Sequence, residues 1–298
     1  MWMRHALAAA FAALIVATPA AAQEKLNVIA TFSILADLVK NVGGDRVEVS
    51  SLVGPNSDAH VYSPTPADAK KLAASKVVIT NGLGFEGWMT RLIKASGFKG
   101  PVIVATKGVK PRKAADAHGH DHGGTDPHAW QSVANVKIYV ANIRDALIAA
   151  DPAGKASYEA NAKAYLEKLD ALEKEVIDAV ARIPTDRRRI ITTHDSFGYF
   201  AAAYGIQIIA PQGVSTESQP SAKDVAKIIT QIKRQKIPAV FMENVSDPRL
   251  LKQIADETGA KVGGTLYSDA LTDEKGPAPT YIDLMRHNIG SFSAALAS

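Results

Sequence analysis

Residues 158–183 read YEANAKAYLEKLDALEKEVIDAVARI, and this stretch sets the architecture that we expect of the chain. Its apolar side chains recur with a period near 3.6 over more than about six turns, which is typical of one long amphipathic helix. The positions that carry the period are Tyr158, Ala162, Tyr165, Leu169, Leu172, Val176, Val180 and Ile183. At a rise of 1.5 Å per residue such a helix is about 40 Å long and acts as a stiff brace. We therefore expect no large closure on ligand binding.

Short apolar, β-branched runs lie on both sides of this stretch, with helical segments between most of them. Before it they are Leu26–Thr31, Val47–Val53, Val77–Thr80 and Val102–Ala105, and after it Ile190–Thr193, Ile206–Ile209, Ala239–Met242 and Val262–Leu266. This alternation predicts an α/β fold with two lobes, each a parallel sheet flanked by helices, joined by one long rigid helix. We place the lobes at 23–152 and 184–298 and the linking helix at 153–183. The length of the chain leads us to expect a separate core in each lobe.

Three helix starts carry their own signals. Thr65-Pro66-Ala67-Asp68 combines a capping residue, a proline at the first helical position and a carboxylate three residues after the cap. Ser221–Asp224 repeats the capping pattern, and Asp247-Pro248 opens a helix that Gly259 ends. We expect helices to begin at these three places.

The N-terminus has the composition of a secretory signal peptide. Arg4 and His5 precede an apolar run at 6–16, and Ala20 and Ala22 form an A-x-A cleavage site, so we expect residues 1–22 to be removed on export. The chain has no cysteine, which excludes disulfides and a lipid-modified cysteine and restricts any metal site to His, Asp or Glu. No later run approaches the roughly 20 apolar residues of a membrane-spanning helix. We expect a mature protein free in the periplasm.

The net charge of +4 gives no indication of a nucleic-acid partner. The only dense basic run, Arg187–Arg189, adjoins an expected strand and has no interleaved aromatic side chains. We interpret it as a solvated strand entrance.

Three of the eight histidines lie on loops that follow expected strands or precede an expected helix: His60, His128 and His194. In parallel α/β sheets, ligands bind outside the carboxyl ends of the strands, where such loops converge. Asp269 also leaves an expected strand at that end. Three neutral imidazoles and one carboxylate form a closed tetrahedral set that zinc accepts. Each residue also has a structural interpretation, in which a ring is held by a backbone carbonyl and Asp269 caps a turn.

Of the remaining histidines, His5 belongs to the expected signal peptide, and the other four divide between a loop and a helix. His118, His120 and His122 lie in the low-complexity segment Lys110–Gly124, which we expect to be a loop. We interpret these three as a weak auxiliary zinc-collecting segment, with an ordinary polar loop as the alternative. His287 is expected on a solvated helix face.

Four segments together resemble a known family. They are Asp58-Ala59-His60-Val61-Tyr62, Asp126-Pro127-His128-Ala129-Trp130, Thr193-His194-Asp195-Ser196-Phe197-Gly198-Tyr199-Phe200 and Tyr267-Ser268-Asp269, in the order found in the zinc and manganese solute-binding proteins of ABC transporters. The chain is similar to the zinc branch of that family over essentially its whole mature length.

The resemblance implies a function and a set of ligands. It implies that His60, His128, His194 and Asp269 hold one metal ion between the lobes, two from each lobe. Manganese-selective relatives usually have Glu where this chain has His194, and imidazole suits zinc, so we expect Zn²⁺, with Mn²⁺ as the alternative. The partners implied are the ABC permease of the inner membrane and a periplasmic zinc metallochaperone, with the protein itself a monomer and not an enzyme.

Two further functions stay open at this point. A zinc hydrolase would use three histidines and a bound water, but Asp269 fills the open position, and the sequence has no H-E-x-x-H motif to supply a general base. A periplasmic zinc buffer or adhesin would use the same site without a transporter.

Overall fold

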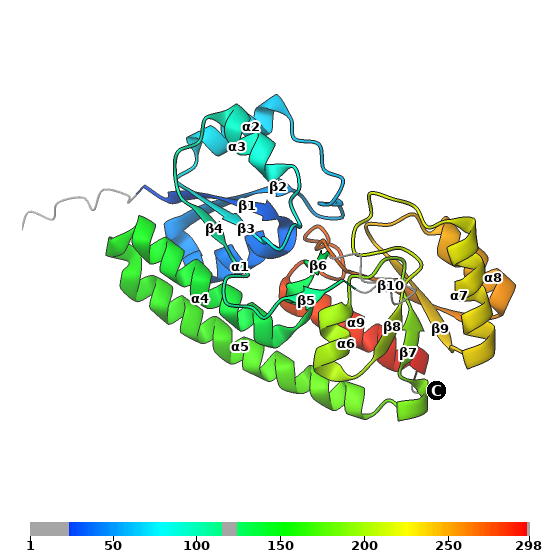
Figure 1. Cartoon of the computed structure of the whole chain (residues 1–298). Coiled ribbons are helices and arrows are strands. Elements are labelled where there is room, and N and C mark those ends of the chain that lie inside the picture. Colours follow the sequence, from blue (N-terminus) through cyan, green and yellow to red (C-terminus); the bar gives the residue numbers. More distant parts are fainter. Residues whose placement is uncertain (1–23, 115–123, 297–298) are drawn as a thin grey trace, which may run out of the picture.

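Two parallel sheets form the two ends of the molecule in this computed structural model, which describes residues 24–114 and 124–296 (Figure 1). The first sheet has the order β2-β1-β3-β4 and the second the order β10-β9-β7-β8. The strands of the first are β1 (Leu26–Phe32), β2 (Val47–Val53), β3 (Val77–Thr80) and β4 (Val102–Val104). Those of the second are β7 (Arg189–Ile191), β8 (Gln207–Ile209), β9 (Ala239–Glu243) and β10 (Lys261–Leu266). All neighbours in both sheets run parallel, as the sequence predicts.

Helices cover both sheets. Those of the first half are α1 (Ser33–Gly43), α2 (Pro66–Ala74), α3 (Met89–Ser96) and α4 (Val133–Ala150), and those of the second are α6 (Gly198–Tyr204), α7 (Ala222–Gln235), α8 (Arg249–Thr258) and α9 (Tyr281–Leu296). Short 3₁₀ turns occupy Gly44–Arg46, Ala129–Gln131, Pro152–Gly154 and Thr185–Arg187. No helix within residues 24–114 and 124–296 combines the length and apolar character needed to cross a membrane.

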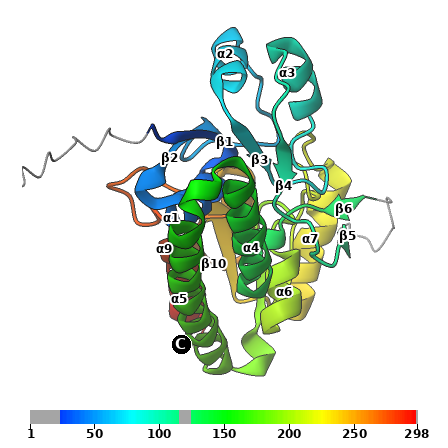
Figure 2. The ribbon, with the colours of Figure 1, turned by 90° about the vertical axis from the view of Figure 1, so that its left-hand side faces the viewer.

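The long helix α5 (Lys155–Ala181) joins the two halves and confirms the predicted brace. Its 27 residues span about 40 Å, and it packs against α1, α4 and α9 (Figure 2). The predicted apolar positions face inward: Tyr158, Leu169, Leu172 and Val176 are fully buried.

The core differs from the expectation of one core in each lobe. A single cluster of buried side chains runs from Phe32 of β1 through Tyr139 and Leu172 to Phe241 and Phe292 in the second half. A smaller cluster around Ile228 and Leu251 lies under α7 and α8. The two halves share a core because the helices α4, α5 and α9 each turn an apolar face toward the region where the halves meet.

The predicted helix starts are confirmed. Thr65 caps α2, with its side chain accepting from the Asp68 backbone N–H, and the Asp68 carboxylate accepts the Thr65 N–H in return. Ser221 caps α7, with its side chain accepting from the Asp224 backbone N–H, and Gly259 ends α8 with φ of +70°. Such a left-handed residue is the common way to end a helix, and glycine adopts it without strain.

One element contradicts the predicted loop at Lys110–Gly124. Residues Arg112–Lys113 form strand β5, which pairs antiparallel with β6 (Thr125–Asp126), and the Ala114 N–H donates to the Gly124 carbonyl at 3.0 Å. His118, His120 and His122 lie outside the described residues. Arg112–Lys113 is therefore a paired strand rather than part of a loop, and the prediction for residues 115–123 falls outside the described residues.

Candidate metal centre

Four side chains from separate parts of the chain meet where the two halves join. His60 lies between β2 and α2, His128 follows β6, His194 follows β7, and Asp269 follows β10. One ligand atom from each lies within 4.8 Å of all the others, and all four residues are buried. The structure thus brings together the four residues that the sequence singles out.

Four distances between atoms of these side chains are close to the edges of a small tetrahedron. His60 Nε2 lies 3.2 Å from His128 Nε2 and 3.4 Å from Asp269 Oδ2. Asp269 Oδ2 is 3.1 Å from His194 Nε2, and Asp269 Oδ1 is 3.7 Å from His128 Nε2. Ligand bonds of 2.0–2.2 Å give tetrahedral edges of about 3.3 to 3.6 Å, and these four distances lie close to that range.

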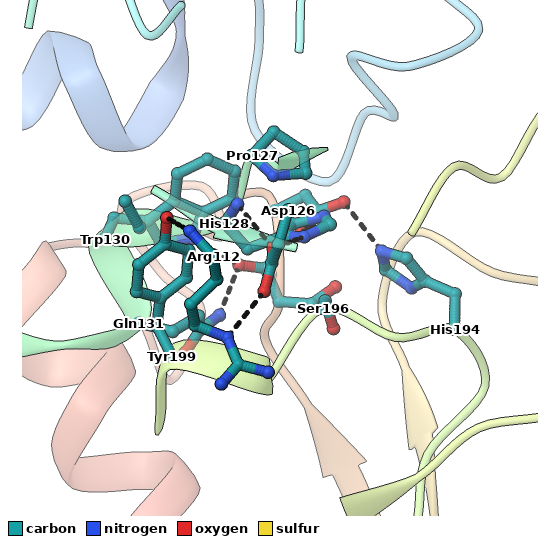
Figure 3. A network of polar contacts seen from close by, with 12 residues as sticks. Arg112, Asp126, Pro127, His128, Trp130, Gln131, His194, Ser196 and Tyr199 are labelled. Atoms are coloured by element: carbon teal, nitrogen blue, oxygen red, sulfur yellow. Dashed lines mark hydrogen bonds and ion pairs between the residues drawn. The ribbon is translucent and has the colours of Figure 1, made fainter. Parts of the chain in front are cut away.

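Asp126 orients the His128 ring. Its Oδ1 lies 2.9 Å from His128 Nδ1 and accepts the His128 backbone N–H at 3.0 Å. Figure 3 shows Arg112 and Tyr199 beside this carboxylate, with the Arg112 Nε donating to Asp126 Oδ2 at 3.4 Å. Because Nδ1 faces a carboxylate, the tautomer is set and Nε2 is left free for a metal.

Glu243, the last residue of β9, does the same for His194. Its Oε1 accepts the backbone N–H groups of Thr193 and His194 at 2.7 and 2.9 Å. Its Oε2 lies 2.6 Å from His194 Nδ1, in a contact whose angle departs from a linear hydrogen bond. One carboxylate therefore fixes both the backbone and the ring of this residue.

Asp269 and His60 are held by neighbours from other elements. The Ser268 carbonyl, next to Asp269, accepts from Trp130 Nε1 at 2.9 Å and from Gln131 Nε2 at 2.8 Å. The His60 ring packs edge-on against Phe85, with centroids 4.7 Å apart. The backbone on both sides of the join is thereby anchored next to the site.

The charges of the cluster shift its pKa values. Burial would raise the pKa of Asp269, but the positive charges of His194 and His128 outweigh it and hold that pKa well below its usual value. Burial disfavours charge on His128, yet Asp269 and Asp126 raise its pKa to about 9. Burial lowers the pKa of His60. The carboxylate is thus ionised and available to a cation.

His287 lies away from this cluster, in surroundings that differ from the prediction. It is half-buried rather than solvated, its Nε2 lies 3.0 Å from the Thr265 carbonyl, and its ring packs on Tyr267. The sequence did not identify the supporting role of Asp126 or of Glu243. Glu243 directly follows the expected strand Ala239–Met242, so the rule that located His194 also marks its position.

Comparisons with known proteins place the chain in a family. The family model described as zinc-uptake complex component A, periplasmic, matches residues 28–295. The iron-binding protein YfeA of Yersinia pestis is 36% identical over 282 residues, covering 95% of this chain and 90% of YfeA. The manganese-binding lipoprotein MntA of Halalkalibacterium halodurans is 34% identical over 275 residues, covering 92% and 89% of the two chains.

A solved structure is also similar to this chain over most of its length. The periplasmic zinc-binding protein TroA from Treponema pallidum is similar with a TM-score of 0.87 at 30% identity, covering 92% of this chain and all of that one. Since the family match spans most of the chain and the buried four-residue cluster has metal-ligand spacing, this chain belongs to the zinc-uptake component A family, whose members are metal-binding, substrate-binding proteins of ABC transporters rather than enzymes.

Proposed function

We propose that this protein captures one zinc ion in the periplasm and delivers it to the permease of an ABC importer. His60, His128, His194 and Asp269 are the ligands in this proposal, two from lobe 23–152 and two from lobe 184–298, with 153–183 as the brace. The observation that carries it is the buried cluster of three imidazoles and one carboxylate, whose ligand atoms all lie within 4.8 Å of one another. Nitrogen-rich tetrahedral donor sets suit zinc.

We propose that the protein reaches the periplasm by export. Residues 1–22 act as a cleaved signal peptide in this proposal, and the mature protein works as a monomer that a periplasmic zinc metallochaperone loads. Relatives are named for iron and manganese as well as zinc, so the argument for zinc rests on the donor set of this chain.

The test is a competition titration of the mature protein with a zinc chelator, alongside His60→Ala, His128→Ala and His194→Ala. We expect one tightly bound zinc per chain and a large loss of affinity in each variant, because each removes one of four bonds to the ion. His287→Ala is the matched control and should bind zinc as the parent does. Unchanged affinity in any of the three variants would remove that residue from the site.

Manganese is the second candidate, and one observation favours it. Asp269 Oδ1 is buried and has no hydrogen-bond partner among the described residues, so the carboxylate has a second oxygen to offer to a metal with a larger coordination number. We expect zinc to outcompete manganese in the parent protein. His194→Glu should reduce the difference between the zinc and manganese affinities, because the variant exchanges a nitrogen donor for oxygen. Metal content after equilibration with both ions measures this. A variant with equal or greater zinc preference would contradict the role assigned to His194.

A further inference from the structure

The four proposed ligands differ in how far solvent reaches them. His128, His194 and Asp269 are 0% exposed, whereas His60 retains 8%. A cavity of about 530 Å³ opens on the His60 side, and its walls include Asp58 and Val61, which flank His60, and Thr193, which precedes His194. Val61 is 53% exposed at this cavity. The cavity is thus lined by close sequence neighbours of His60, the one ligand of the four that keeps exposed surface.

His60 sits on the segment 54–64, which has no helix or strand along its length. The middle of the segment is tied to its own half, since Trp88 Nε1 donates to the Ala59 carbonyl at 2.8 Å. On the opposite side, Asp58 links it to the other half. Asp58 Oδ1 accepts the His60 backbone N–H at 2.9 Å, and Asp58 Oδ2 accepts the Thr216 hydroxyl at 2.6 Å.

We propose that metal enters and leaves through this cavity, and that the hydrogen bond between Asp58 and Thr216 is a latch that holds His60 over the ion. The proposal rests on the proposed function, in which His60 is a ligand. His60 is the first ligand to leave and the last to bind, because it alone of the four keeps exposed surface.

The latch makes a kinetic prediction that distinguishes it from a merely structural contact. A gate has to open for entry and for exit, so loss of the latch raises both the association and the dissociation rate constants. Loss of a contact that only shapes the bound site raises dissociation alone. The affinity should therefore change less than either rate constant does.

Thr216→Val tests the latch, because it keeps the shape of the side chain and removes only the hydroxyl. Stopped-flow mixing of zinc-loaded mature protein with excess chelator gives dissociation, and mixing metal-free protein with zinc gives association. We expect dissociation about tenfold faster, which corresponds to about 1.4 kcal/mol, with association faster too. Ser215→Ala is the control in the same loop, where Ser215 Oγ accepts the Glu217 N–H, and should leave both rates unchanged.

Asp58→Asn distinguishes the effect of the hydrogen bond to Thr216 from the effect of the negative charge of Asp58. An asparagine can still hydrogen-bond to Thr216, so dissociation should stay near that of the parent. A fall in association that disappears at high salt would instead identify Asp58 as an electrostatic attractor of the cation and overturn the latch. Unchanged dissociation in Thr216→Val, or faster dissociation with unchanged association, would overturn it equally. If the zinc affinity of His128→Ala equals that of the parent, the proposed four-ligand site itself fails, independently of the latch.

Discussion

Glu243 and His194 show how one buried carboxylate supports a metal-binding ring. Glu243→Gln keeps an oxygen for the backbone N–H groups of Thr193 and His194 but removes the negative charge beside His194 Nδ1. We expect zinc affinity to fall by about 10- to 100-fold, as for other supporting groups of this kind. Competition titration measures it, with the exposed Glu217→Gln as control. Parent-like affinity would mean that Glu243 serves only the backbone.

The pH dependence of binding follows from His128. Its pKa is raised to about 9, because Asp269 and Asp126 outweigh the effect of burial, so without metal the ring carries a proton at neutral pH. A ligating imidazole must be neutral, and zinc must therefore displace that proton. Because this pKa is raised, competition between the proton and zinc for the His128 ring weakens only as the pH rises through about 9. Zinc affinity should therefore increase from neutral pH to about pH 9.

Calorimetry in buffers of different ionisation heat counts the protons released. We expect at least one proton per zinc near neutral pH. A histidine with the ordinary pKa of about 6.5 would be mostly neutral there already, so an affinity that levels off above about pH 7 would contradict the raised value.

At the scale of elements, the paired strands β5 and β6 join the two ends of the segment whose sequence contains His118, His120 and His122. The Ala114 N–H bonds to the Gly124 carbonyl, so residues 115–123 can be replaced by Asn-Gly, a pair suited to a two-residue hairpin turn. We expect the variant to keep one tightly bound zinc, because the four proposed ligands already complete a shell. Loading rate or total zinc capacity should fall. Loss of tight binding would show that His118, His120 or His122 belongs to the primary site.

The same elements show what the sequence could and could not predict. The strands, the caps and the long helix follow local periodicity and capping, and the residues that meet at the centre follow from their places at strand ends. β5 and β6 are two residues long, too short for any period to show. The contact between Asp58 and Thr216 joins residues 158 positions apart, and no local pattern specifies such a pair.

At the scale of the whole molecule, the shared core and α5 oppose movement of one half against the other. We expect metal-free and zinc-loaded protein to have the same radius of gyration in small-angle X-ray scattering. Exchange through the segment 54–64 requires only a local opening, which scattering would not register. A clear decrease on adding zinc would show that the halves close as rigid bodies and that the brace bends.

The continuous core also bears on how such proteins change their metal in evolution. Each half supplies two of the four proposed ligands, yet the main apolar core runs through both halves, so neither half can carry it alone into a new partner. If recombination replaced one half with that of a distant homologue, the new half would have to fit the packing of Tyr139, Leu172 and Phe292 where the halves meet. Point substitution at the ligands carries no such burden, so a change of metal preference in this architecture requires only single codons and leaves the scaffold whole.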